Sequence, residues 1–179
     1  MIPKLMAEHD HLRKTLNLLE SQFLSLCRGE KPDYAIMRVI LVYVQEYLEQ
    51  AHHPLEDIIF SVILKKGGEE AELARKLITD HTELEVVTRK LRESIELLKG
   101  GANYDEEEFK RDIFAFLTRQ RQHLYNEEMI MYPLVEKRLT KKDWKSIKSM
   151  APQKEDPVFG EGKQGEYELL FREIESRSK

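Results

Sequence analysis

The chain has 179 residues, of which 35% are charged, and its formal net charge is −4. Such a length suits one domain with at most an appendage, and its acidic and basic residues are interspersed. The surface therefore gives no electrostatic case for a nucleic-acid or anionic-membrane partner. Cys27 is the only cysteine, which excludes an internal disulfide and a cysteine-based zinc or iron–sulfur site, and we expect a buried spectator thiol.

Hydrophobic spacing predicts helix along most of the chain. A first helix is expected over residues 4–26, and a second begins near Asp33, a suitable N-cap, and ends at Gly67. Pro54 interrupts the second helix, because proline cannot donate a backbone hydrogen bond, so we expect a kink or a widened turn there. A third helix is expected over residues 70–99, and a fourth begins after Asp105 and extends beyond His123.

Beyond residue 139 the pattern changes. A short amphipathic helix is expected over residues 141–150, then an irregular strap rich in proline and glycine over residues 151–165, and a last helix over about residues 167–175. The last helix offers apolar residues that pack back on the bundle or meet a second subunit, giving a homodimer. The predicted fold is all-α: an up-down-up-down antiparallel four-helix bundle over residues 1–139 with a C-terminal helical extension over residues 140–179.

Two segments repeat the same chemical pattern. Residues 52–60 and 123–131 both read His-x-x-x-Glu-acid-apolar-Ile-apolar, 71 positions apart. Residues 8–12 and 80–84 both read acid-His-x-x-Leu, 72 positions apart. Five of the six histidines fall at or beside the defining positions of this repeat.

The repeat puts one histidine on the core-facing stripe of each predicted helix: His9, His52, His81 and His123. Glu56 and Glu127 follow two of them by one turn, on the same helix face. A buried, unpaired carboxylate is costly, and these stripes carry no lysine or arginine, so the two glutamates need a cation. A pair of divalent metals would supply it, and mixed nitrogen and oxygen ligands suit iron, manganese or zinc better than calcium.

Simpler interpretations exist for each piece. A lone histidine on an apolar stripe is more often a hydrogen-bonded core residue, and a single His-x-x-x-Glu pair is commonly a surface contact. Four histidines and two glutamates on four core stripes, at matching points of a repeat, favour a metal site. His53 is a further candidate ligand, whereas His11 lies off the apolar stripe and is expected to be exposed.

For several residues next to the predicted ligands, the sequence allows more than one role. Asp57 and Glu128 are interpreted as acids that orient imidazole N–H groups or lie on the surface. Gln120 precedes His123 by one turn and is expected to hydrogen-bond at the rim of the site, and Glu85 is a ligand only if it turns inward. The tyrosines are expected to be packing residues, with proton donation near a metal as the alternative; they are Tyr43, Tyr47, Tyr125 and Tyr132.

These motifs resemble those of hemerythrin-like proteins, which carry the HHE cation-binding domain. The resemblance covers about residues 1–139 and rests on Glu8-His9, residues 52–60, Asp80-His81, residues 123–128 and Tyr132-Pro133. It implies a four-helix bundle around a non-haem di-iron centre, often oxo- or hydroxo-bridged. The ligands that the resemblance implies are His9, His52, His53, Glu56, His81, His123 and Glu127.

The chain departs from the oxygen carriers of that family. They place two histidines one turn apart on the third helix, where this chain has Leu77 before His81 and Glu85 after it, and they have an aspartate where this chain has Glu127. These departures argue against reversible oxygen carriage, but not against reaction of iron with oxygen. The Cys-containing N-terminal domain of the family's iron–sulfur repair members is also missing, which argues against that role. Residues 156–160 resemble an extension found in some bacterial relatives.

The expected function is therefore binding or sensing of oxygen or nitric oxide at a His/Glu di-iron centre in a cytoplasmic protein. The N-terminus has no apolar run and no segment reaches membrane-spanning length, so no membrane partner is expected. Two alternatives remain: an oxidoreductase that consumes peroxide or nitric oxide, or an iron donor for cluster repair. A purely structural module is the third interpretation.

Overall fold

The computed structural model describes residues 1–100, 105–161 and 165–177, and it is helical almost throughout. The helices of the first half are α1 (Ile2–Cys27), α2 (Tyr34–Tyr43), η1 (Val44–His52) and α3 (His53–Lys66). Those that follow are α4 (Glu70–Lys99), α5 (Glu106–Asn126), η2 (Glu127–Met131), α6 (Tyr132–Arg138), α7 (Lys141–Met150) and α8 (Glu166–Arg177). No strand occurs in the described ranges, so the all-α prediction is confirmed.

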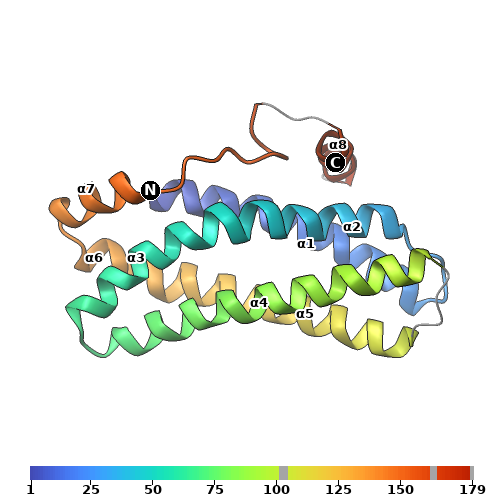
Figure 1. Ribbon diagram of the computed structural model, residues 1–179, viewed down its shortest axis with the longest axis horizontal. Coiled ribbons are helices and arrows are strands. Elements are labelled where there is room, and N and C mark those ends of the chain that lie inside the picture. The colour runs from blue at the N-terminus through green and yellow to red at the C-terminus, as the bar shows by residue number, and fades with distance from the viewer. Residues whose placement is uncertain (101–104, 162–164, 178–179) are drawn as a thin grey trace.

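The helices join into four long rods that lie side by side (Figure 1). They are α1, the continuous α2–η1–α3, α4, and the continuous α5–η2–α6. Helix α4 packs against α2, α3 and α5, and α1 packs against α5. The molecule is a helical bundle as expected, and the strict up-down-up-down order stays a prediction.

Capping residues and glycines set the ends of the rods. The Asp33 carboxylate accepts hydrogen bonds from the backbone N–H groups of Ala35 and Ile36, which begins α2 as predicted. Asp105 caps α5 in the same way. Gly67 ends α3 with φ +69°, a left-handed conformation that glycine adopts without strain.

The widened turn expected beside Pro54 is present, and a second one lies just before Pro133. Residues Val44–His52 of η1 form a π-helix that ends just before Pro54, and residues Glu127–Met131 of η2 form another just before Pro133. A wider turn changes which side chains face inward. His52 and His53 are consecutive, and both are buried in the bundle.

The apolar core has two parts with a polar layer between them. One cluster contains Leu12 and Leu16 of α1 and continues through the α2 end of the second rod. The other contains Leu5 of α1, together with Leu55 and Ile59 of α3. His9 lies between the two clusters on α1, so the predicted metal ligands are shielded from water at both ends.

The C-terminal extension packs on the bundle, which is one of the two predicted alternatives. Helix α8 contacts α1 and α2, and its Leu170 and Ile174 join the bundle's own core. Leu169, another of the apolar residues of the last helix, is 63% exposed. The division into two units and the homodimer stay predictions.

The expected burial of Cys27 and the expected exposure of His11 are wrong. Cys27 is exposed, because it falls in the last turn of α1, where the helix leaves the core. His11 is half-buried, because the C-terminal strap covers it: Nδ1 of His11 lies 3.3 Å from Oδ2 of Asp156, and the imidazole stacks on Phe159. Hydrophobic periodicity on α1 alone could not reveal a distant segment that covers this face.

Candidate metal centre

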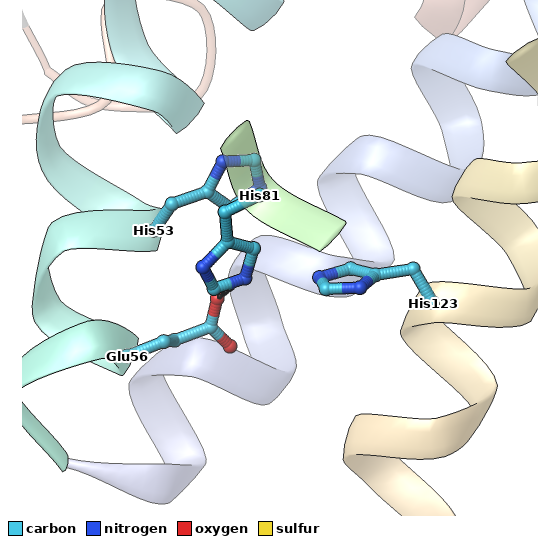
Figure 2. A group of neighbouring side chains, drawn as sticks. All are labelled: His53, Glu56, His81 and His123. Carbon is cyan, nitrogen blue, oxygen red and sulfur yellow. Dashed lines mark ion pairs between the residues drawn. The ribbon is translucent and has the colours of Figure 1, made fainter. Parts of the chain in front are cut away.

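The four rods bring all of the predicted ligands into the interior of the bundle. Each is at most 5% exposed; they are His9, His52, His53, Glu56, His81, His123 and Glu127. Figure 2 shows four of them converging from α3, α4 and α5. Glu85 is exposed, so the open alternative of a further ligand on α4 is wrong.

The ligand atoms form two groups that share a carboxylate. In the first group, His53, His81 and His123 lie with Glu56, and in the second, His9 and His52 lie with the same Glu56. Within each group the ligand atoms are all within 4.8 Å of one another. Each group is compact enough to surround one metal ion.

Glu56 reaches both groups through its two oxygens. Oε2 lies 3.3 Å from Nε2 of His52 and 3.4 Å from Nε2 of His81, while Oε1 lies 3.7 Å from Nε2 of His9. The carboxylate therefore stands between the two sets of imidazoles.

Glu127 repeats this arrangement from the fourth rod. Its Oε1 lies 3.0 Å from Nε2 of His123 and 3.4 Å from Nε2 of His81, and its Oε2 lies 3.5 Å from Nε2 of His9. Two carboxylates thus connect the two imidazole groups, as expected of a centre for two cations.

The unsatisfied atoms fit a bound cation. Oε2 of Glu56 and Oε2 of Glu127 are buried, and neither accepts a hydrogen bond from any residue that the structure describes. Nε2 of His9 and Nε2 of His52 face each other at 3.0 Å. No lysine or arginine forms an ion pair with either glutamate in the described ranges, so positive charge must come from protons or from metal.

The protonation equilibria show how strongly the centre requires positive charge. Burial lowers the pKa of His9, but hydrogen bonds to Glu128 and Glu56 outweigh it and raise this pKa to about 10. Burial also opposes ionisation of the Glu56 carboxyl, yet the surrounding imidazoles hold the pKa of Glu56 well below its usual value. Burial and the neighbouring His81 and His52 lower the pKa of His53, which keeps its imidazole neutral and suited to metal binding.

A ring of outer acids orients the imidazoles. Asp57 accepts from Nδ1 of His81 at 2.7 Å, and Glu128 accepts from Nδ1 of His9 at 2.8 Å, as predicted. A hydrogen bond at Nδ1 leaves Nε2 directed at the centre. Each imidazole is held by an acid from a different rod.

Two further acids belong to this ring, and their roles were missed. Glu8 accepts from Nδ1 of His52 at 2.8 Å, and Oδ2 of Asp80 lies 3.9 Å from Nδ1 of His123. The acid-His pairs of the repeat, at residues 8–9 and 80–81, were the available signal. In each pair the histidine faces the centre while the acid supports a histidine of the next rod.

Tyr132 enters the centre rather than only packing beside it. Its hydroxyl donates a hydrogen bond to Glu56 and lies 3.0 Å from Nε2 of His9. Burial and the Glu56 charge raise the pKa of Tyr132, so the phenol keeps its proton.

The other tyrosines have different positions. Tyr47 donates to Glu8 at 2.6 Å and Tyr43 to Asp156 at 3.0 Å, so both combine packing with a hydrogen bond. Tyr125 is 57% exposed, so the expected packing role is wrong for it.

A cleft of about 540 Å³ lies between α4 and α5, next to the centre at His123. His123 and Asp80 line it, together with Arg119. Arg119 donates to Asp80 at 3.0 Å. A small molecule in this cleft would therefore lie against a predicted ligand.

Fold and site together define a helical bundle with an internal histidine–carboxylate cluster of the kind that holds metal cations. The family model of the hemerythrin HHE cation-binding domain matches residues 1–135, which is most of the chain. The chain therefore belongs to the hemerythrin HHE cation-binding domain family. A comparison with curated proteins finds no match. Among the described residues, no helix is long and apolar enough to cross a membrane.

Proposed function

We propose that the centre holds two iron ions and that the protein binds or senses a small ligand there, with oxygen and nitric oxide as the candidates. His9 and His52 would hold one ion, and His53, His81 and His123 would hold the other. Glu56 and Glu127 would contribute carboxylate oxygens between the two groups of imidazoles. Manganese and zinc are the alternatives that the same nitrogen and oxygen ligands would accept.

One observation carries the proposal: two buried carboxylates each face imidazoles of both groups. Seven protein ligands are too few to fill the coordination of two such metals, so a position remains for a small ligand. When bound, iron would supply one-electron redox changes and this open position. The cleft beside His123 gives such a ligand an approach from solvent.

The chain's own residues prepare this chemistry. The outer acids hold the imidazoles with Nε2 inward, which lowers the entropic cost of collecting the ligands. The two apolar clusters exclude water on both sides. Tyr132 keeps a proton within hydrogen-bonding distance of Glu56 and His9.

The test is metal analysis of freshly purified protein, followed by anaerobic reduction and addition of oxygen or nitric oxide. We expect about two irons per chain and an absorption band that appears when oxygen or nitric oxide is added. A reduced iron form that reacts with neither gas would eliminate the proposal.

Tyr132 favours a second candidate, an oxidoreductase that consumes peroxide or nitric oxide. Reduction of hydrogen peroxide to two waters requires two protons and two electrons from an external reductant, and the Tyr132 hydroxyl is a hydrogen-bond donor already inside the centre that could orient the peroxide. Turnover assays with both substrates on iron-loaded protein separate the candidates. Absence of turnover with both would leave, outside gas binding, only donation of iron for cluster repair.

A further inference from the structure

Gln120 is a buried polar residue one turn from His123, and its amide has no hydrogen-bond partner among the described residues. Its side chain is 0% exposed, and neither the amide nitrogen nor the amide oxygen has a hydrogen-bond partner in the described part of the chain. It lies on α5, one turn before His123 and on the same helix face. The rim hydrogen bond expected from the sequence is therefore not made to any residue that the structure describes.

An unsatisfied buried amide is unusual and calls for an explanation. Folding removes the amide from water, and without a partner it destabilises the folded state relative to an apolar side chain of the same size. Gln22 shows the ordinary arrangement in this chain: it is also buried, and its amide oxygen accepts from the Asp33 N–H at 2.8 Å. Gln120 forms no comparable hydrogen bond with any residue that the structure describes.

Glu49, the equivalent residue in the first half, also has a buried side-chain atom without a hydrogen-bond partner among the described residues. Glu49 precedes His52 as Gln120 precedes His123, and the two positions are 71 apart, the spacing of the repeat. Oε1 of Glu49 is also buried without a hydrogen-bond partner among the described residues. Both halves therefore place an unpaired polar atom a turn away from an imidazole of the centre, and the side chain in the second half is fully enclosed.

We propose that Gln120 binds the small ligand of the metal centre, with its amide N–H donating a hydrogen bond to that ligand. This inference rests on the proposed function. The side chains at i and i+3 of a helix are neighbours, so the amide lies beside the metal position that His123 serves. His123 also lines the cleft between α4 and α5, so a ligand arriving by that route meets His123 first, and the enclosed Gln120 lies one turn away along α5.

The chemistry of the amide defines the class of ligand. An amide N–H is neutral and strengthens binding of a ligand that carries negative charge or a lone pair away from the metal. Small anions and partly reduced oxygen species belong to this class, whereas a ligand without an accepting atom gains nothing. Gln120 thus makes the centre selective for ligands that accept a hydrogen bond.

The test compares Gln120→Leu with Gln22→Leu, the same substitution at an amide that has a partner. Iron-loaded, reduced and reoxidised protein is titrated with azide, an anion that accepts hydrogen bonds, and metal content is measured for each variant. Melting temperature is measured after removal of metal.

We expect Gln120→Leu to keep about two irons per chain, to bind azide about tenfold more weakly, and to melt no lower than the parent protein. Gln22→Leu should bind azide normally and melt at a lower temperature, because the Asp33 N–H loses its acceptor. Unchanged azide affinity in Gln120→Leu, or a loss of melting temperature matching that of Gln22→Leu, would overturn the inference. If the parent protein itself holds iron but binds neither azide nor gas, the proposed function fails instead.

Discussion

The two halves of the bundle carry the same pattern of predicted ligands, but the acids that support His52 and His123 do so at different distances. In the first half, residues 1–66, Glu8 is fixed by a hydrogen bond from Tyr47 at 2.6 Å and in turn holds His52 at 2.8 Å. In the second half, residues 70–138, Asp80 lies 3.9 Å from His123 and is drawn by Arg119 at 3.0 Å. The first half therefore anchors its imidazole closely, and the second leaves it loosely supported.

The looser half is also the accessible one. His123 lines the cleft between α4 and α5, and the unpaired Gln120 lies one turn away. In the first half the C-terminal strap and α8 cover α1 and α2. Both halves supply predicted metal ligands, but on the proposed function a small ligand would approach from the second half, where His123 lines the cleft.

The largest expected effect comes from the carboxylates that join the halves. Glu56→Ala or Glu127→Ala should lower bound metal from about two ions per chain to one or none, because each removes a ligand from both imidazole groups. Metal analysis after equilibration with iron measures this. Glu85→Ala is the control, since Glu85 is an exposed glutamate on α4. Full metal content in both ligand variants would contradict the assignment.

The next largest effect is expected from the acids that orient the imidazoles, and their substitution should weaken metal binding more in the first half than in the second. Glu8→Gln is expected to weaken metal binding by about 10- to 100-fold, the usual cost of losing such a support, while Asp80→Asn should cost less, since Asp80 is farther from its imidazole. Competition with a chelator measures both affinities. Equal losses would show that the difference in distance does not affect binding and would remove the contrast between the halves.

The all-α fold and the inward-facing histidines and glutamates were predictable from the sequence because both depend on periodicity. A histidine on an apolar stripe must face the core, and a glutamate one turn later must follow it, so the inward position of His9, Glu56 and Glu127 was predictable from spacing. The widened turn before Pro54 was predictable from the missing N–H of proline.

Contacts between distant segments were not predictable in this way. Tyr132 reaches Glu56 across the bundle, and Asp156 reaches His11 and Tyr43 from the strap, yet no local pattern encodes either pairing. Cys27 shows the reverse error, because the end of α1 exposes a residue type that is usually buried. Periodicity identifies the inward face of a helix, but not its partner.

The strap provides a third way to test the contrast. Asp156 accepts from Tyr43, from His11 and from the backbone of Val158 and Phe159. Asp156→Ala would leave the buried Tyr43 hydroxyl unpaired and should cost about 2 kcal/mol of unfolding free energy. Hydrogen exchange should then increase in residues 151–160 and α1, with α4 and α5 unchanged. Increased exchange spread evenly over both halves would show that the strap does not act on the first half alone.

The smallest expected effect concerns Glu49 and its counterpart Gln120, because only the glutamate titrates. Burial raises the pKa of Glu49 from its ordinary value of 4.5 to about 7, with the Thr88 hydroxyl opposing the shift. Below pH 4.5 the carboxyl is mostly protonated in both the folded and the unfolded chain. As the pH rises toward 7, the unfolded chain releases its proton first, so folding stability falls.

Glu49→Gln makes the two halves alike at this position and should remove that loss. Relative to the parent protein, the variant should gain about 1 kcal/mol at about pH 8 and nothing at about pH 4, a figure reduced for partial solvent screening. Urea unfolding of metal-free protein across this range measures the difference, and contributions from the histidines cancel because both proteins share them. Thr88→Val should raise the pKa of Glu49 further and extend the loss to higher pH. A gain that is the same at both pH values would mean that folding does not shift the pKa of Glu49.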